Sequence, residues 1–149
     1  MLIGINAVNI NSGGGVTHIE NILSYLPQNF AKNNKIIVWT NPKLFNYLKK
    51  FKIQNKTINI IKKKVSYFGF FWMFFFLYKE LKKNNCDLLF SVDGLALQKF
   101  KKTVILFQNL IPFCNHEIIK YGFCFTTVKL ILLRYLYYIS KKKVMERYI

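Results

Sequence analysis

At 149 residues the chain is long enough to bury one hydrophobic core and short for two, so we expect a single domain. Its hydrophobic content of 52% and aromatic content of 17% exclude a disordered chain, because such a sequence can bury enough apolar surface to offset the entropy of ordering. The formal charge of +17 at pH 7 suits an anionic partner, either a nucleic acid or an anionic membrane surface, whereas the enrichment in Lys, Asn, Ile and Phe also fits an AT-rich genome, which raises the charge without any partner.

The basic residues are nearly all lysines, since only Arg134 and Arg147 are arginines. Recognition of bases and phosphates favours the forked guanidinium group over lysine, which argues against nucleic-acid binding. The cysteines lack the spacing of a zinc site or a disulfide framework, and no histidine stands near them in a ligand pattern. We therefore expect no metal, and free thiols in a reducing cytoplasm, at Cys86, Cys114 and Cys124.

No signal peptide is recognisable, because Met1 leads directly into the apolar "LIGINAV" without a basic region or a cleavage site. We expect the protein on the cytoplasmic side. The most apolar stretch, Val65 to Tyr78, is shorter than the run of about 20 residues that spans a bilayer. It predicts a helix packed under a sheet. A helix lying in the membrane interface, peripheral at the inner face of the plasma membrane and held by flanking lysines, is the alternative.

The first half of the chain alternates strand and helix signals. The apolar run Leu2–Val8 is typical of a buried parallel strand. After three glycines, apolar residues at helical spacing predict a helix over Val16–Leu26, ended by Pro27. Lys35–Thr40 reads as a second strand. Asn41 followed by proline suits the N-cap and first residue of a helix that runs to about residue 51.

The second half continues the alternation. Strands are predicted at Thr57–Ile61, Asp87–Val92 and Thr103–Gln108. The aromatic segment supplies one helix that ends at about Asn84, and the last predicted helix covers Thr126–Lys142. Alternating strands and helices imply βαβ units, so the predicted fold is α/β, a Rossmann-like, doubly wound parallel sheet in one domain spanning residues 1–149.

Polar residues follow three of the predicted strands, at the carboxyl ends where such sheets bind ligands. They are Asn9 to Gly15, Asp93 with Gly94, and Gln108 with Asn109. We expect these three groups to face one crevice.

The stretch "NSGGGVTHIENIL" places Gly13, Gly14 and Gly15 directly before a helix. Glycines there let a ligand approach the backbone, and the free amides at the helix N-terminus favour a phosphate or diphosphate. A nucleotide-hydrolase loop would end in Gly-Lys-Ser/Thr, whereas Val16 and Thr17 follow here. A dinucleotide fingerprint fails as well, because its third glycine would replace His18. A tight turn that binds no ligand is the alternative.

Four blocks occur in characteristic order: "IGINAVNINSGGGVTHIENIL", "CDLLFSVDGL", "VILFQNLIPF" and "YGFCFTTVKLILLRYL". Together they resemble the N-terminal domain of GT-B-fold family-4 glycosyltransferases of bacterial surface-polysaccharide synthesis. The resemblance covers Leu2 to about Ser140. It implies a retaining transfer of a sugar from a nucleotide-diphosphate donor to a glycan or lipid-linked acceptor, without a metal or other cofactor.

The resemblance also implies a set of binding residues. It places the amides of Gly13, Gly14 and Gly15, with Thr17 beside them, near the donor diphosphate and the acceptor. It places Asp93 against the acceptor, and Gln108 with Asn109 close to the reacting sugar. For His18 and Glu20 two readings stay open, direct contact with the ligand or a supporting place on the helix surface.

Enzymes of this family have a second domain that binds most of the nucleotide sugar. Its motifs are missing here, so we expect the chain to be inactive alone, as a truncated product, a remnant, or one subunit of a split enzyme with a separate C-terminal half. Two alternatives remain: a noncatalytic basic module that binds membrane or nucleic acid, and a nucleotide-binding enzyme of another doubly wound family.

Overall fold

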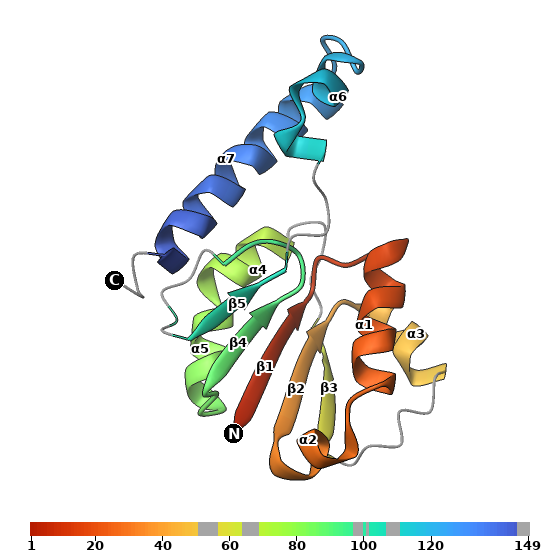
Figure 1. Ribbon diagram of the computed structural model, residues 1–149, viewed down its shortest axis with the longest axis vertical. Coiled ribbons are helices and arrows are strands. Elements are labelled where there is room, and N and C mark those ends of the chain that lie inside the picture. Colours follow the sequence, from red (N-terminus) through yellow and green to blue (C-terminus); the bar gives the residue numbers. More distant parts are fainter. Residues whose placement is uncertain (51–56, 64–68, 97–99, 101, 107–110, 146–149) are drawn as a thin grey trace.

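The computed structural model describes residues 1–50, 57–63, 69–96, 100, 102–106 and 111–145, and the structural statements below refer to these. Five parallel strands form one sheet in the order β3-β2-β1-β4-β5, with helices on both faces (Figure 1). The predicted α/β, doubly wound fold is thereby confirmed. The strands are β1 (Leu2–Ala7), β2 (Lys35–Thr40), β3 (Ile58–Lys62), β4 (Leu88–Ser91) and β5 (Thr103–Ile105).

The helices match the sequence predictions in part. The aromatic segment was expected to form one helix but forms two, α4 and α5, which are separated at Phe76. Two short helices, α2 and α6, and the 3-10 turn η1 had no clear sequence signal. The helices are α1 (Gly14–Ser24), α2 (Gln28–Asn33), α3 (Pro42–Lys50), α4 (Gly69–Phe75), α5 (Leu77–Lys83), η1 (Ile111–Phe113), α6 (Asn115–Ile119) and α7 (Phe125–Met145).

The central strand β1 is apolar except at Asn6, because both of its faces are covered. Ile3, Ile5 and Ala7 point into a core built with α1 and α3. The alternate residues, ending with Val8, point to the opposite core, which α4, α5 and α7 complete. This core is tightly packed at Gly4, where an added Cβ would lie 2.7 Å from the Trp39 ring. A side chain at this position would therefore collide with the indole.

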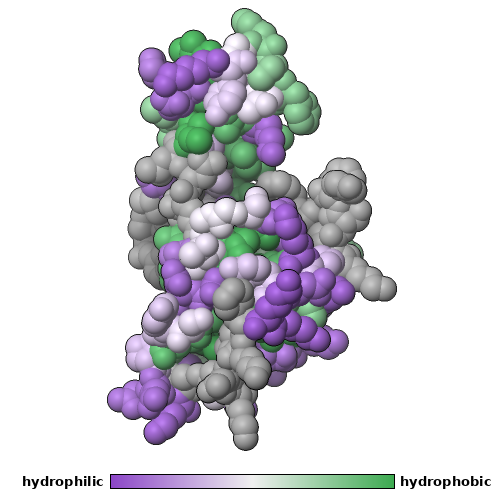
Figure 2. Space-filling view, turned by 90° about the vertical axis from the view of Figure 1, so that its right-hand side faces the viewer, coloured by the Kyte–Doolittle hydropathy of each residue, from purple (hydrophilic) through white to green (hydrophobic). Residues whose placement is uncertain are grey.

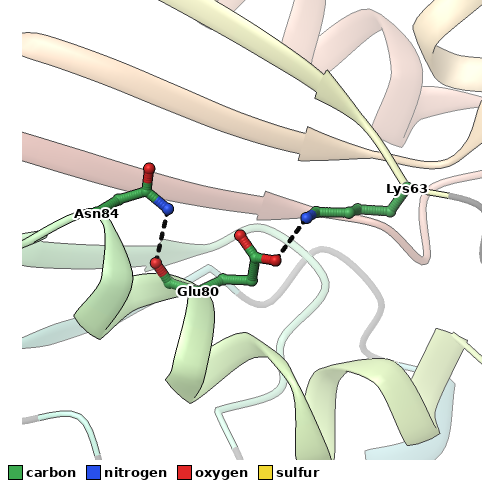
Figure 3. Close-up of polar contacts among 3 residues, drawn as sticks. All are labelled: Lys63, Glu80 and Asn84. Atoms are coloured by element: carbon green, nitrogen blue, oxygen red, sulfur yellow. Dashed lines mark hydrogen bonds and ion pairs between the residues drawn. The ribbon is translucent and has the colours of Figure 1, made fainter.

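An ion pair ties the end of β3 to α5 (Figure 3). The Lys63 Nζ lies 2.7 Å from Glu80 Oε1, and both side chains are mostly shielded from solvent. The same ammonium group lies 5.7 Å from the centre of the Trp72 ring on α4. Asn84 Nδ2 donates to the Glu80 carbonyl at 2.8 Å, which caps the last turn of α5 and confirms the predicted end of the aromatic segment.

The long helix α7 has its C-terminal end near α4 and projects away from the sheet, with α6 beside its far end (Figure 1). Its inner side contributes Tyr137 to the core of α4 and α5, and Ser140 Oγ accepts a hydrogen bond from the Ala96 amide at 3.2 Å. Arg134 holds the projecting part together: its guanidinium donates to the Pro112 carbonyl and, at 2.8 Å, to Asn115 Oδ1.

Candidate functional site

The order of the strands defines where a ligand can bind. β2 and β3 follow on one side of β1, whereas β4 and β5 lie on its other side, so the direction of winding reverses between β1 and β4. In open parallel sheets, ligands bind outside the carboxyl ends of the strands at this reversal. The loops that leave β1 and β4 there carry two of the three predicted polar groups, the one that begins at Asn9 and the one at Asp93.

The Asp93 carboxylate lies at the centre of a hydrogen-bonded cluster in this position. Its Oδ2 accepts from Asn9 Nδ2 at 2.8 Å and, at the longer distance of 3.5 Å, from Asn6 Nδ2. Its Oδ1 accepts from Ser91 Oγ at 2.8 Å and from the Leu95 amide at 3.3 Å. The cluster therefore joins the loop after β1 to the loop after β4, as the sequence predicts for Asn9 and Asp93.

Burial dominates the electrostatics of this carboxyl group and raises the pKa of Asp93, while hydrogen bonds from Ser91 and Asn9 act in the opposite direction with smaller effect. A protonated Asp93 would also find a hydrogen-bond acceptor within the cluster. The Ser91 hydroxyl lies in contact with the Leu95 carbonyl as well, so it can accept from a protonated Asp93 and donate onward. The Asp93 carboxyl group can thus hold either charge state without breaking the cluster.

Helix α7 lies against the segment that follows Asp93, because the Ala96 amide donates to Ser140 Oγ at 3.2 Å. Burial raises the pKa of Tyr137 on the same helix, and the negative charge of Asp93 raises it further.

The loop after β1 is fixed by Asn41, which is buried at the start of α3. Its amide donates to the carbonyls of Val8 at 3.0 Å and Ile10 at 2.7 Å. Its Oδ1 accepts from the Leu44 amide at 2.8 Å, which confirms the predicted N-cap. One side chain therefore caps α3 and holds the loop that leads to the glycines.

Of the three consecutive glycines, Gly13 has the unusual backbone. It is the N-cap of α1 with φ 66° and ψ −150°, a region essentially restricted to glycine. Gly14 and Gly15 already belong to the first turn of α1, where helix geometry leaves the amides without intrahelical acceptors. The loop thus combines one conformational requirement with a positive helix end that faces away from the sheet.

Beside this helix end lies a pocket of about 340 Å³ between α1 and α3. Lys43 brings a positive charge to its edge, and the Tyr47 hydroxyl donates to Glu20 Oε2 at 2.9 Å. That hydrogen bond is the main cause that raises the pKa of Tyr47. Glu20 thus holds a side chain of the pocket wall, the supporting role left open by the sequence. The lining residues are Asn11, Ser12, Gly13, Val16, Thr17, Lys43, Leu44 and Tyr47.

The predicted single crevice consists, in the described residues, of two neighbouring parts. Gly13 and Thr17 line the pocket on the face covered by α1 and α3. Asn6 and Ser91 of the Asp93 cluster point to the other face, where Met73 of α4 contacts Asn6. Both parts lie at the carboxyl edge of the sheet. The third predicted group, Gln108 and Asn109, lies outside the described residues.

Sequence reasoning missed several residues of this region. Asn6 and Ser91 are fully buried polar residues inside strands that otherwise read as apolar, and this contrast was a usable signal. Lys43 and Tyr47 carry no such signal, because one exposed lysine and one tyrosine on an amphipathic helix are ordinary. The described residues contain no group of three or more histidine, cysteine or acidic side chains that could hold a metal ion.

Within the described part of the chain, the helices are all too short or too polar to cross a membrane. Comparisons with protein-family models, with curated proteins and with solved structures found no match to this chain.

Proposed function

We propose that this chain is the N-terminal, acceptor-side part of a retaining glycosyltransferase of the GT-B type, which moves a sugar from a nucleotide-diphosphate donor to a glycan or lipid-linked acceptor. The observation that carries the proposal is the Asp93 cluster at the reversal point of the sheet. A carboxyl group with a raised pKa is held there by Asn9 and Ser91, beside a glycine loop and a helix N-terminus. The four sequence blocks agree with this reading.

The donor diphosphate suits the pocket at the start of α1. Two diphosphate charges are best held by amides that point outward and by a nearby cation. Gly14 and Gly15 begin α1 directly after Gly13, which lines the pocket, so we expect their free amides at its border, and Lys43 in the pocket lining supplies the cation. Thr17 adds a hydroxyl group to the same wall. No metal is needed for this arrangement, because the helix end and the lysine already oppose the negative charge.

The acceptor suits the Asp93 cluster. In the transfer, an acceptor hydroxyl oxygen forms a bond to the anomeric carbon as the bond from that carbon to the diphosphate oxygen breaks, and the hydroxyl proton passes to the leaving diphosphate. The Asp93 carboxyl group orients the hydroxyl through a hydrogen bond, and the side chains of Asn6 and Asn9 keep the carboxyl group in place. We propose further that the wall facing this edge comes from a donor-binding unit, since a sugar nucleotide needs burial on both sides for affinity.

The first experiment is ligand binding by the intact chain. UDP and GDP, with and without an attached hexose, are titrated while protein NMR signals are followed. We expect binding that weakens at least tenfold in Lys43→Ala. The matched control is Lys35→Ala, an exposed lysine at the opposite, amino end of β2, which should leave binding unchanged.

The second experiment is sugar transfer with the intact chain and a donor-binding unit supplied as a separate polypeptide. Asp93→Ala should abolish transfer. Asp87→Ala is the matched control, because that carboxylate accepts from the Leu2 amide at 2.7 Å at the opposite edge of the sheet. If neither UDP nor GDP binds at millimolar concentration when the chain is mixed with the donor-binding unit, or if the two aspartate variants lose transfer equally, the proposed function is wrong.

A further inference from the structure

The end of the molecule farthest from the sheet carries a cluster of bare apolar side chains. The loop between α6 and α7 leaves Phe123 fully exposed, and Phe125 and Ile119 keep 84% and 74% of their surface in solvent. We call Ile119, Tyr121, Phe123 and Phe125 the tip. Figure 1 shows that α6 and the start of α7 hold this loop away from the domain, and Figure 2 shows hydrophobic surface at the same end. Side chains of this kind do not usually stay in water.

The apolar surface continues from the tip along α7. Five apolar residues at spacings of three and four share the outer side of the helix, opposite the inner side where Leu130 and Tyr137 are buried. Each of the five is more than half exposed. We call them the outer stripe: Val128, Ile131, Leu132, Tyr135 and Tyr138. Phe125 joins tip and stripe into one surface.

The charges around this surface are almost all positive. From Ile111 to Met145 the chain has one acidic residue, Glu117, and the Lys120 ammonium pairs with it at 2.7 Å. Exposed Lys129 borders the outer stripe, and the whole chain carries +17. Two copies of so basic a chain repel each other, which disfavours a second copy as the occupant. Valine, isoleucine and leucine offer little to nucleic-acid bases, which stack on aromatic and guanidinium planes.

We propose that the tip and the outer stripe form a docking surface for an anionic lipid bilayer. Aromatic and aliphatic side chains of the tip enter the boundary between headgroups and acyl chains, while lysines remain at the phosphates. Helix α7 then lies on the membrane and does not cross it, in line with the lack of a described helix that could. The inference is independent of the proposed sugar transfer, because it rests on exposure and charge at the other end of α7.

The test is sedimentation of the full chain with vesicles. We expect binding to phosphatidylglycerol-containing vesicles that falls at least tenfold on neutral phosphatidylcholine and in high salt. Phe123→Ser with Phe125→Ser should weaken binding to anionic vesicles by tenfold or more, since each ring loses its burial in the membrane. Both positions are exposed, so the unfolding midpoint should not change. The matched control is Phe74→Ser with Phe75→Ser on α4, two phenylalanines that are 52% and 56% exposed.

A second measurement does not depend on these variants. Cys124 lies inside the tip and is exposed, so a polarity-sensitive fluorophore attached there, with Cys114 changed to serine, should shift to the blue on anionic vesicles. The same dye on Cys114, with Cys124 changed to serine, should shift less. Equal binding to neutral and anionic vesicles, an equal loss in the α4 control, or no spectral shift at Cys124 would overturn the proposal. So would a concentration-dependent dimer, or a complex with single-stranded DNA, that the Phe123 and Phe125 variant abolishes.

Discussion

Two neighbouring glycines of the loop should respond in opposite ways to alanine. Gly13 has φ 66° and ψ −150°, and although no atom lies within 4 Å of a Cβ built there, this backbone region is itself strained for any L side chain. The strain amounts to about 1–3 kcal/mol. Alanine also has less conformational entropy than glycine in the unfolded chain, which offsets about 0.4–1 kcal/mol of this strain. Gly13→Ala should therefore lower the free energy of unfolding by roughly 1–2 kcal/mol.

Gly14 is the matched control. It begins α1 with an ordinary backbone, and a Cβ there also meets open space. Gly14→Ala should raise the free energy of unfolding by about 0.5–1 kcal/mol, because alanine is the better helix residue. Urea unfolding followed by circular dichroism measures both variants at equal m-value. If Gly13→Ala were as stable as Gly14→Ala, the loop would not need a glycine at its N-cap, and the conformational explanation would be wrong.

Four further predictions concern stability and reactivity. Asn41→Ala should lower the free energy of unfolding by about 2–4 kcal/mol, because it removes the α3 cap and both loop hydrogen bonds. In the same urea assay, Asn41→Ser should regain about 1 kcal/mol of this loss, because serine restores the cap. Gly4→Ala should lower the free energy of unfolding by about 1–3 kcal/mol or more, because the added methyl group overpacks the core. An unchanged midpoint of thermal unfolding would contradict this. Because the folded pKa of Asp93 is raised above 3.8, the folded state binds this proton more tightly than the unfolded state, so the contribution of this group to stability falls as pH rises through the folded pKa. Asp93→Asn should lack that fall in urea unfolding between pH 4 and 8, and a parallel pH curve for the two proteins would contradict it. Iodoacetamide at pH 8 should modify Cys124 well before Cys86. Cys124 is exposed and hydrogen bonds from Thr127 lower its pKa, whereas burial raises the pKa of Cys86 to about 11. Peptide mass spectrometry measures the order of modification, and the reverse order would contradict the prediction.

The sheet was predictable because its strands carry their own signals. Lys35–Thr40 was predicted with the observed bounds, since five of its six residues are buried and Asn41 with Pro42 marks where it must stop. The prediction of one helix in the aromatic segment was wrong for the converse reason. Nothing in its composition marks Phe76, and the division there is slight, because the Phe76 backbone stays helical and its amide and carbonyl bond Trp72 and Glu80 at helical spacing.

The candidate site was predictable only at the level of loops. Parallel strands bring Asn9 and Asp93 to one edge, and that much follows from the alternation of elements. Whether a residue points to the α1 side or the α4 side depends on register, which the sequence alone does not specify for Asn6 or Ser91. The pocket wall supplied by Tyr47 could not be foreseen either, because a tyrosine on an amphipathic helix is an ordinary residue.

The central place of β1 also has a consequence for how the protein folds. Strand β1 needs partners from far along the chain: Val8 meets Asn41, 33 residues on, and Asn6 meets Ser91, 85 residues on. Contacts that close such long loops slow folding relative to helical proteins of this size. During synthesis the β1–β2 pair must therefore wait, with one edge unpaired and apolar, until β4 has left the ribosome. The interval before β4 arrives is when this chain is most exposed to aggregation.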